Sequence, residues 1–216
     1  MTAVAKISEA PVRLGRDDWL SVALETLVSD GIEHVKIKKL AENLKTSRSS
    51  FYWFFEDRSD LLAALLDLWK SRNTGAILDR ANAPSTSIAA SVLAVFECWV
   101  DDTLFDARLD FAIREWARRD GDVLRAIETA DQERIAAISA MFRRHGYGAR
   151  ESLVRARILY FTQIGYYALV PDESLDARRR NVDAYILGFT GQAPTPDERA
   201  GFDRFLAALE NRRPPE

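Results

Sequence analysis

Several residue types that carry specific chemistry are scarce in this chain of 216 residues. The single cysteine, Cys98, excludes an intramolecular disulfide and a zinc site built from several thiolates, and it suits a reducing compartment. The two histidines, His34 and His145, stand apart in expected turns, without the spacing that metal ligands show. No glycine-rich phosphate loop or Ser/His/Asp arrangement stands out. We therefore predict no metal, no cofactor and no catalytic residue, and we expect the protein not to be an enzyme.

Long apolar runs and an excess of either charge are also missing. The longest apolar stretch, residues 87–100, contains Glu97 and is too short to span a bilayer. The first 19 residues contain no apolar core of the kind found in secretory signals. Because 30 Lys and Arg oppose 33 Asp and Glu, the net charge of −3 predicts no general attraction to nucleic acid or anionic lipid. We expect a cytoplasmic protein without membrane contact, in which any basic patch is local.

The apolar residues recur at steps of three and four from Arg16 onward, and sustained alternation with a period of two is absent. The fold class predicted is therefore all-α, with about nine to ten helices. The first helix spans 17–30 and ends at Gly31, two short helices flank residues 45–47, and a long helix runs from Asp57 to about Arg80. Further helices are expected at 87–103, 107–119, 123–145, 149–169, 175–189 and 196–210.

Basic and aromatic residues concentrate between Lys36 and Arg58, where six bases oppose three acids. Two short helices with a tight turn between them have the form of a helix-turn-helix, whose second helix enters the major groove of DNA. Leu40, Ala41, Leu44, Phe51 and Phe55 would form its buried side. An ordinary pair of short helices with a solvated basic face is the alternative that periodicity leaves open.

The residues expected to face DNA combine cations, hydroxyls and two aromatics. Arg48 has the donors for guanine O6 and N7, small hydroxyls allow close approach to the duplex, and Tyr52 and Trp53 offer donors to phosphates and apolar faces to thymine methyls. The candidate DNA-binding residues are Lys36, Lys38, Lys45, Thr46, Ser47, Arg48, Ser49, Ser50, Tyr52, Trp53 and Arg58.

This region resembles the tetracycline repressor (TetR) family of bacterial transcriptional regulators. The resemblance is carried by Leu20, Ala23, Leu24 and Gly31, by the run 40–44, and by residues 47–55 with Arg58, Leu61 and Leu62. It covers about residues 16–66 by motif, and the remainder matches in helix number and length only. Where the family usually has Gly-Val, this chain has Lys45-Thr46, so Lys45 either adopts a left-handed conformation or the turn is built differently. Arg58 replaces the usual Lys and keeps its charge.

The resemblance implies a ligand-responsive regulator, most simply a repressor, that binds double-stranded DNA as a homodimer. Two recognition helices about 34–36 Å apart would meet successive major grooves of a near-palindromic operator, and a small-molecule effector would release them. Residues 1–15 would be a flexible arm, 16–62 the DNA-binding domain, and 63–216 a helical domain for ligand binding and dimerisation. The helices at 149–169 and 175–189 would form the dimer contact.

The helices between Ser87 and Leu169 are rich in aromatic residues, most of which we expect in the core. The functional alternative is a pocket between helices for a partly apolar or aromatic effector, with a few polar groups that orient it. The candidate pocket residues are Phe96, Trp99, Phe111, Arg114, Trp116, Tyr160, Gln163 and Tyr167. The run Arg178–Arg180 is expected to be a solvent face.

Two other functions compete with DNA-dependent regulation. A helical adaptor with a helix-turn-helix that no longer binds DNA is compatible with the lack of a net basic N-terminal domain. A magnesium-dependent all-α enzyme would use Asp101, Asp102 and Asp106, although a second acidic cluster on a facing helix is not apparent. A capped helix end is the simpler interpretation of these aspartates.

Overall fold

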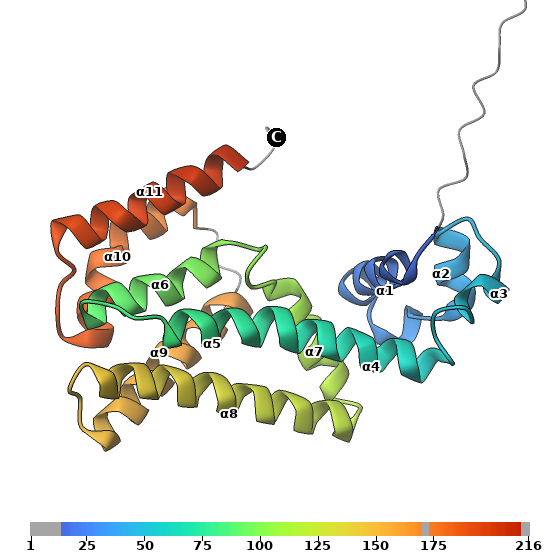
Figure 1. Ribbon diagram of the computed structural model, residues 1–216, viewed down its shortest axis with the longest axis horizontal. Helices are drawn as coiled ribbons and strands as arrows, with labels where there is room; N and C mark the ends of the chain where they lie inside the picture. Colours follow the sequence, from blue (N-terminus) through green and yellow to red (C-terminus); the bar gives the residue numbers. More distant parts are fainter. Residues whose placement is uncertain (1–13, 170–172, 213–216) are drawn as a thin grey trace, which may run out of the picture. The chain divides into compact units, whose positions relative to one another are not determined.

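The computed structural model describes residues 14–169 and 173–212 and consists, over these ranges, of helices joined by turns (Figure 1). The predicted all-α fold is confirmed. The chain separates into two compact units, one that ends at Leu65 and one that begins at Leu66. None of the described helices is both long enough and apolar enough to cross a membrane. The predicted N-terminal arm lies, up to position 13, outside the described residues.

The described part of the N-terminal unit contains three α-helices and the start of a fourth, in the order that the sequence predicts. They are α1 (Arg16–Asp30), α2 (Ile37–Asn43), α3 (Arg48–Phe51) and α4 (Arg58–Trp69). Helix α1 begins where the carboxylate of Asp18 accepts the backbone N–H of Gly15 at 2.6 Å. It ends at Gly31, whose φ of 83° suits glycine and whose N–H donates to the carbonyl of Leu27.

Aromatic packing holds this unit together. Trp19 meets Phe51 edge to face with ring centroids 5.2 Å apart, and Phe51 stacks on Phe55 at 5.3 Å. Leu40 and Phe51 are fully buried, as predicted for the inner side of the two short helices, whereas Leu44 is only half-buried. The large buried rings explain how such short helices are held in place, since four to seven residues form no stable helix alone.

The helical run that starts at Arg58 is interrupted once. A single π turn, Lys70–Thr74, follows α4 and leads into α5 (Gly75–Asn82), so the prediction of one unbroken helix to about Arg80 is corrected. Asn73 exchanges hydrogen bonds with the backbone of Asp106, and Thr74 accepts one from Nε of Arg134. These partners lie 33 and 60 residues away in the sequence, so the local spacing of residues does not predict these hydrogen bonds or the π turn.

The C-terminal unit contains the remaining helices, whose ends agree with the prediction to within a few residues. They are α6 (Ile88–Val100), α7 (Ala107–Ala117), α8 (Gly121–Arg144), α9 (Ala149–Leu169), α10 (Leu175–Thr190) and α11 (Pro196–Arg212). Thr195 and Glu198 form the predicted capping box, with the Thr195 N–H donating to Glu198 at 2.7 Å. Ser87, the N-cap of α6, donates to the same Glu198 carboxylate at 2.5 Å.

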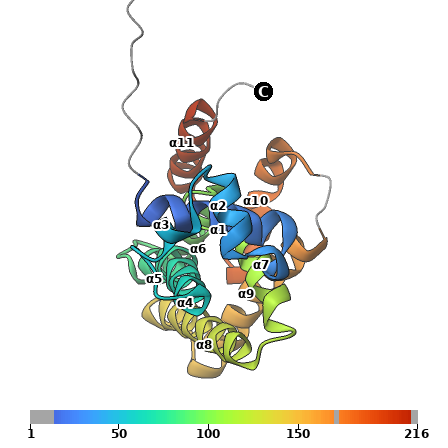
Figure 2. The ribbon, with the colours of Figure 1, turned by 90° about the vertical axis from the view of Figure 1, so that its right-hand side faces the viewer.

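The long helix α8 organises the C-terminal unit. It packs along α9 and also contacts α5 and α7, while α6 packs against α5, α10 and α11 (Figure 1 and Figure 2). Val92, Ile138, Phe142, Leu159 and Ile186 belong to the apolar core between these helices. Aromatic and aliphatic side chains from distant parts of the chain thus meet around α6 and α8, and burial of this area is the main stabilising contribution to the unit.

Candidate nucleic-acid interface and ligand cavity

The turn between α2 and α3 closes in the left-handed conformation. Lys45 has a φ of 52°, the first of the two possibilities that the sequence leaves open. The N–H of Thr46 donates to the carbonyl of Ala41 at 2.9 Å, and that of Lys45 donates to Glu42 at 3.1 Å. These two bonds are the Schellman pattern, in which glycine usually occupies the position of Lys45. The lysine therefore carries a conformational cost and keeps a cation, exposed, at the turn.

Replacing Lys45 by glycine is expected to raise the free energy of unfolding by about 0.5–1 kcal/mol, because glycine adopts the left-handed conformation without the Cβ clash. Urea denaturation followed by tryptophan fluorescence measures the change. Lys36→Gly is the matched control, since Lys36 is exposed and has a φ of −120°, and this variant is not expected to gain stability. A Lys45→Gly protein no more stable than wild type would show that the left-handed conformation of Lys45 has no such cost.

The residues that begin and follow α3 form the most exposed aromatic surface of the N-terminal unit. Trp53 is 83% exposed and Tyr52 is 60% exposed, and Arg48 lies exposed at the start of the same helix. Among the hydroxyl residues predicted to face DNA, Ser47 and Ser49 are exposed, whereas Thr46 and Ser50 are half-buried and bonded to each other at 3.0 Å. This surface therefore presents the donors and apolar faces that base edges and phosphates require.

The predicted cations of this unit do not share one environment. Lys36 and Lys38 are exposed, and Lys38 lies 3.9 Å from Glu42. Arg58 is half-buried, and its Nε and a terminal nitrogen donate to the carbonyls of Val35 at 2.6 Å and Ile32 at 2.9 Å. The Arg58 guanidinium therefore fastens the start of α4 to the loop before α2, a role that the sequence pattern did not indicate.

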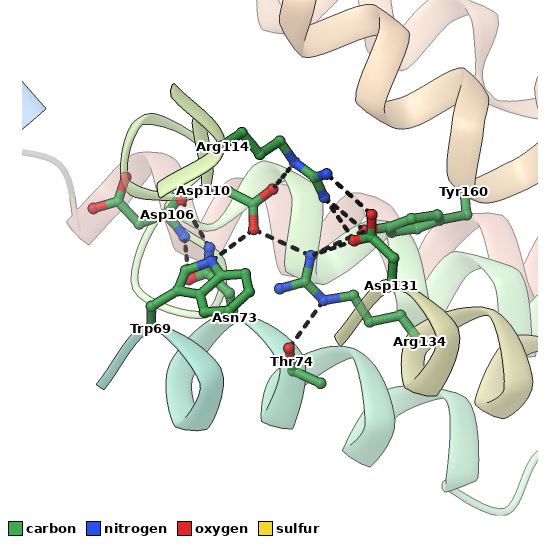
Figure 3. Close-up of polar contacts among 9 residues, drawn as sticks. All are labelled: Trp69, Asn73, Thr74, Asp106, Asp110, Arg114, Asp131, Arg134 and Tyr160. Atoms are coloured by element: carbon green, nitrogen blue, oxygen red, sulfur yellow. Dashed lines mark hydrogen bonds and ion pairs between the residues drawn. The ribbon is translucent and has the colours of Figure 1, made fainter. Parts of the chain in front are cut away.

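Two residues that the sequence assigned to a ligand pocket take part in a largely buried ionic cluster of the C-terminal unit (Figure 3). Arg114 of α7 makes two hydrogen bonds to Asp131 of α8, at 2.7 and 3.0 Å, and a third to Asp110 at 2.9 Å. Tyr160 of α9 donates to Asp131 at 2.6 Å. Arg134 contacts Asp110 at 3.1 Å and the Tyr160 oxygen at 2.9 Å.

The centre of the cluster is sealed from solvent, since the side chains of Asp110 and Arg134 are both 0% exposed, whereas Arg114 and Asp131 are partly exposed. Burial works against ionisation of Asp110, but the cations of Arg134 and Arg114 hold the pKa of its carboxyl below the ordinary value. Burial raises the pKa of the Tyr160 hydroxyl, which stays protonated and donates. Trp69, at the end of α4, donates its indole N–H to Asp110 at 2.8 Å (Figure 3). The cluster thus connects α7, α8 and α9 to the end of α4 and to the π turn that follows it.

A cavity of about 90 Å³ lies between α6, α9, α10 and α11. Of the predicted pocket residues, Phe96, Trp99 and Gln163 line it. Tyr167 lines an adjoining cavity of about 340 Å³ and donates to the carbonyl of Trp99 at 2.9 Å. The other predicted members line neither of these two cavities; they are Phe111, Arg114, Trp116 and Tyr160. Arg114 and Tyr160 take part in the ionic cluster, and Phe111 and Trp116 lie on α7.

Arg178 is one of the cavity residues that the sequence pattern did not indicate. The expectation that residues 178–180 form a solvent face holds for Arg180, which is exposed, but not for Arg178 and Arg179, which are half-buried and line the first cavity. Arg178 also lines the adjoining cavity. Its guanidinium lies 4.6 Å from the centre of the Tyr166 ring. The helical phase of α10 turns Arg178 inward, and a run of three arginines gives no sign of which members line a cavity.

The aspartates near the end of α6 have structural partners. Asp101 is buried and accepts from the backbone and hydroxyl of Thr103, at 2.9 and 2.6 Å, and from Arg212 at 3.1 Å. Asp106 caps α7 by accepting the N–H of Leu109 at 3.0 Å. In the ranges that the structure describes, no three His, Cys, Asp or Glu residues are grouped to hold a metal ion. Burial raises the pKa of the Cys98 thiol to about 12, so that it stays protonated at neutral pH.

Two short helices joined by a tight turn, with exposed basic and aromatic side chains on the second, define a helix-turn-helix domain of the type that binds duplex DNA. The model of the family "Bacterial regulatory proteins, tetR family" matches residues 20–65. The tetracycline repressor protein class E of Escherichia coli is 38% identical over 53 residues, which are 24% of this chain and 25% of that protein. The chain thus matches about a quarter of the length of that curated relative.

Solved structures resemble this chain over most of its length. AmtR of Mycobacterium smegmatis has a TM-score of 0.61 at 16% identity, over 96% of this chain and 99% of its own. GusR of Salmonella enterica has a TM-score of 0.57 at 17% identity, over 89% and 95%. At these identities the likeness establishes the fold. The similarity to the tetR family of bacterial regulatory proteins thus lies in the N-terminal domain, over residues 20–65.

Proposed function

We propose that this protein is a ligand-responsive, DNA-binding transcriptional regulator of the cytoplasm, and that a dimer represses by binding a near-palindromic operator. The observation that carries the proposal is the exposure of Tyr52 and Trp53 beside Arg48 in a domain that matches the tetR family. Two large aromatic side chains held in solvent at the end of a short helix favour a binding surface. Residues 16–62 would bind DNA, and residues 63–216 would bind the effector and dimerise.

Each candidate residue has a distinct part in this proposal. Arg48 would donate to guanine O6 and N7, and the hydroxyls of residues 46, 47, 49 and 50 would bond base edges or phosphates. Tyr52 and Trp53 would contact phosphates and thymine methyls, and the exposed Lys36, Lys38 and Lys45 would neutralise phosphates. Arg58 would contribute charge at the start of α4 while it holds the loop before α2.

The dimer contact is proposed on α9 and α10, over residues 149–169 and 175–189. Val154, Ile158 and Phe161 are each about half exposed and recur at steps of four and three, so that they form one apolar stripe on α9. Leu187, also half exposed, adds apolar surface on α10. A stripe of this kind supports packing against helices of a second copy, which would present two recognition helices to one operator.

The effector would bind in the cavity between α6, α9, α10 and α11. It would shift the population of the protein toward a conformation with lower affinity for DNA. A route for the coupling is available within the C-terminal unit. Asp106 borders the adjoining cavity and exchanges hydrogen bonds with Asn73 of the π turn, which directly follows α4. Displacement of Asp106 would therefore act on the end of α4, the helix that begins in the DNA-binding unit.

Selection from a random duplex library at a stated salt concentration tests the function. We expect the wild-type protein to enrich a near-palindrome, and Trp53→Ala to lose this enrichment. Leu124→Ala, which removes a half-exposed apolar side chain of α8, is the matched control and should retain it. Enrichment of an unpaired half-site would contradict the dimer, and no enrichment by a folded wild-type protein would favour the helical adaptor.

A further inference from the structure

We propose that the cavity between α6, α9, α10 and α11 takes an amphipathic carboxylic acid, with the apolar part among the aromatic side chains and the carboxylate on Arg178. The inference deepens the proposed function, since this ligand would be the effector. It rests on the shape and the charged groups of the C-terminal unit, and it does not depend on which DNA sequence the protein binds.

The walls of the cavity favour an apolar ligand with a flat part. Six aromatic side chains line it, and aliphatic residues such as Leu159, Val182 and Leu206 fill the spaces between them. Phe96 packs against Trp99 and against Phe189, with ring centroids 5.5 and 6.1 Å apart, so the aromatic side chains of the wall support one another. A ring or short hydrocarbon chain placed here would be removed from water on most sides, which is the dominant favourable contribution in sites of this kind.

The charged groups of the cavity differ in whether they already have partners. Arg179 donates a hydrogen bond to Asp203 at 2.6 Å, and Glu173 accepts a hydrogen bond from the Tyr166 hydroxyl at 2.6 Å. Nε of Arg178, by contrast, is buried and has no hydrogen-bond partner among the described residues. A buried donor of a charged group that lacks an acceptor costs free energy, and an anionic ligand oxygen would supply the missing acceptor.

The position of Arg178 fixes which end of the ligand it would hold. Arg178 lies in the wall that the aromatic cavity shares with the adjoining cavity of about 340 Å³, together with Trp99, Val100 and Glu173. The adjoining cavity is the more polar of the two, since Asp102, Asp106 and Arg108 also line it. An apolar tail in the first cavity would therefore place its polar head at the boundary, against Arg178.

A ligand amine is the competing chemistry, because Glu173 lines the same wall and Asp102 and Asp106 line the adjoining cavity. Asp106 already caps α7 and lies 3.6 Å from Arg72. Glu173 is already engaged by Tyr166, and burial together with this carboxylate raises the pKa of the Tyr166 hydroxyl to about 12, so that the hydroxyl remains a donor at neutral pH. The group that lacks an acceptor at the boundary is thus the Nε–H of Arg178. The arrangement favours an acid over an alcohol or an amine with the same tail.

Calorimetric titration of the full chain without DNA tests the proposal. The probes are 3-phenylpropanoate, 3-phenylpropan-1-ol and 3-phenylpropylamine, which share one tail and differ in the head group. We expect the wild-type protein to bind the acid at least tenfold more tightly than the alcohol or the amine. Arg178→Met should abolish this preference and leave the affinity for the alcohol unchanged, and Arg178→Lys should restore part of it.

Arg180→Met is the matched control, because Arg180 is exposed two residues further along the same helix, and it should keep the full preference. Circular dichroism melting establishes that each variant is folded. Equal affinities for the acid and the alcohol, preference for the amine, a preference that survives Arg178→Met, or no binding of any probe would each overturn the ligand class. Because DNA is absent, failure of operator binding would leave these results unchanged and would count against the proposed function alone.

Discussion

Arg134→Met is expected to lower the free energy of unfolding by about 3–5 kcal/mol, because it leaves the fully buried carboxylate of Asp110 with one guanidinium fewer. The methionine keeps much of the side-chain volume, so the loss of stability is due to the missing charge and not to a cavity. Chemical denaturation followed by circular dichroism measures it. The expected loss is large for one substitution because Asp110 and Tyr160 lose the same partner together.

The matched control for this variant lies on the same helix. Arg125 pairs with Asp122 near the start of α8, and both side chains are well exposed. Arg125→Met is therefore expected to change the free energy of unfolding by no more than about 0.5 kcal/mol. Similar losses in the two variants, or a loss below about 1 kcal/mol for Arg134→Met, would contradict the importance of the buried cluster.

The same cluster has a signature in the pH dependence of stability. Since the pKa of Asp110 is lowered in the folded protein, its contribution is fully present above its unfolded pKa of about 3.9 and is lost as the pH falls toward the folded value. The loss of stability below about pH 4 should therefore be less steep in Asp110→Asn than in the wild-type protein. An equal slope in both would indicate that Asp110 does not titrate with unfolding.

Arg48→Ala is expected to weaken operator binding by about 1–3 kcal/mol and to relax the preference at one base pair of each half-site. The reason is that a bidentate contact to guanine discriminates between bases, and no other cation lies in α3. Binding to the selected operator and to its single-base variants, measured at several salt concentrations, gives both quantities. A uniform loss over all base pairs would argue against direct readout by this residue.

Lys38→Ala is expected to affect operator binding differently from Arg48→Ala. Lys38 is exposed on α2, and a phosphate contact there would weaken binding to all sequences alike and reduce the slope of log affinity against log salt by about one. Lys70, exposed in the C-terminal unit and 3.3 Å from Glu133, is the neutral control, and Lys70→Ala should change neither quantity. Identical effects of Arg48→Ala and Lys38→Ala would remove the distinction between reading bases and positioning the domain.

The features that the sequence alone determined are those with local causes. Gly31 ends α1, Thr195 with Glu198 begins α11, and each signal operates within a few residues of the chain. The spacing of apolar residues likewise fixed which sides of α2 and α3 are buried. The exposure of Tyr52 and Trp53 followed from the same periodicity, so the candidate DNA-binding surface could be predicted before the tertiary structure was known.

Only the tertiary structure decided where polar groups pair across long separations. Arg134 meets Asp110 from 24 residues away, and Thr74 meets Arg134 from 60, so neither the ionic cluster nor the π turn is visible in a local pattern. Arg114 and Tyr160, predicted in a ligand pocket, are held in that cluster. Arg178 lies at a cavity wall because the packing of α10 turns it inward, whereas Arg180 faces solvent. Helical periodicity gives the direction of a side chain from its own axis, and only the packing of neighbouring helices gives what that side chain meets.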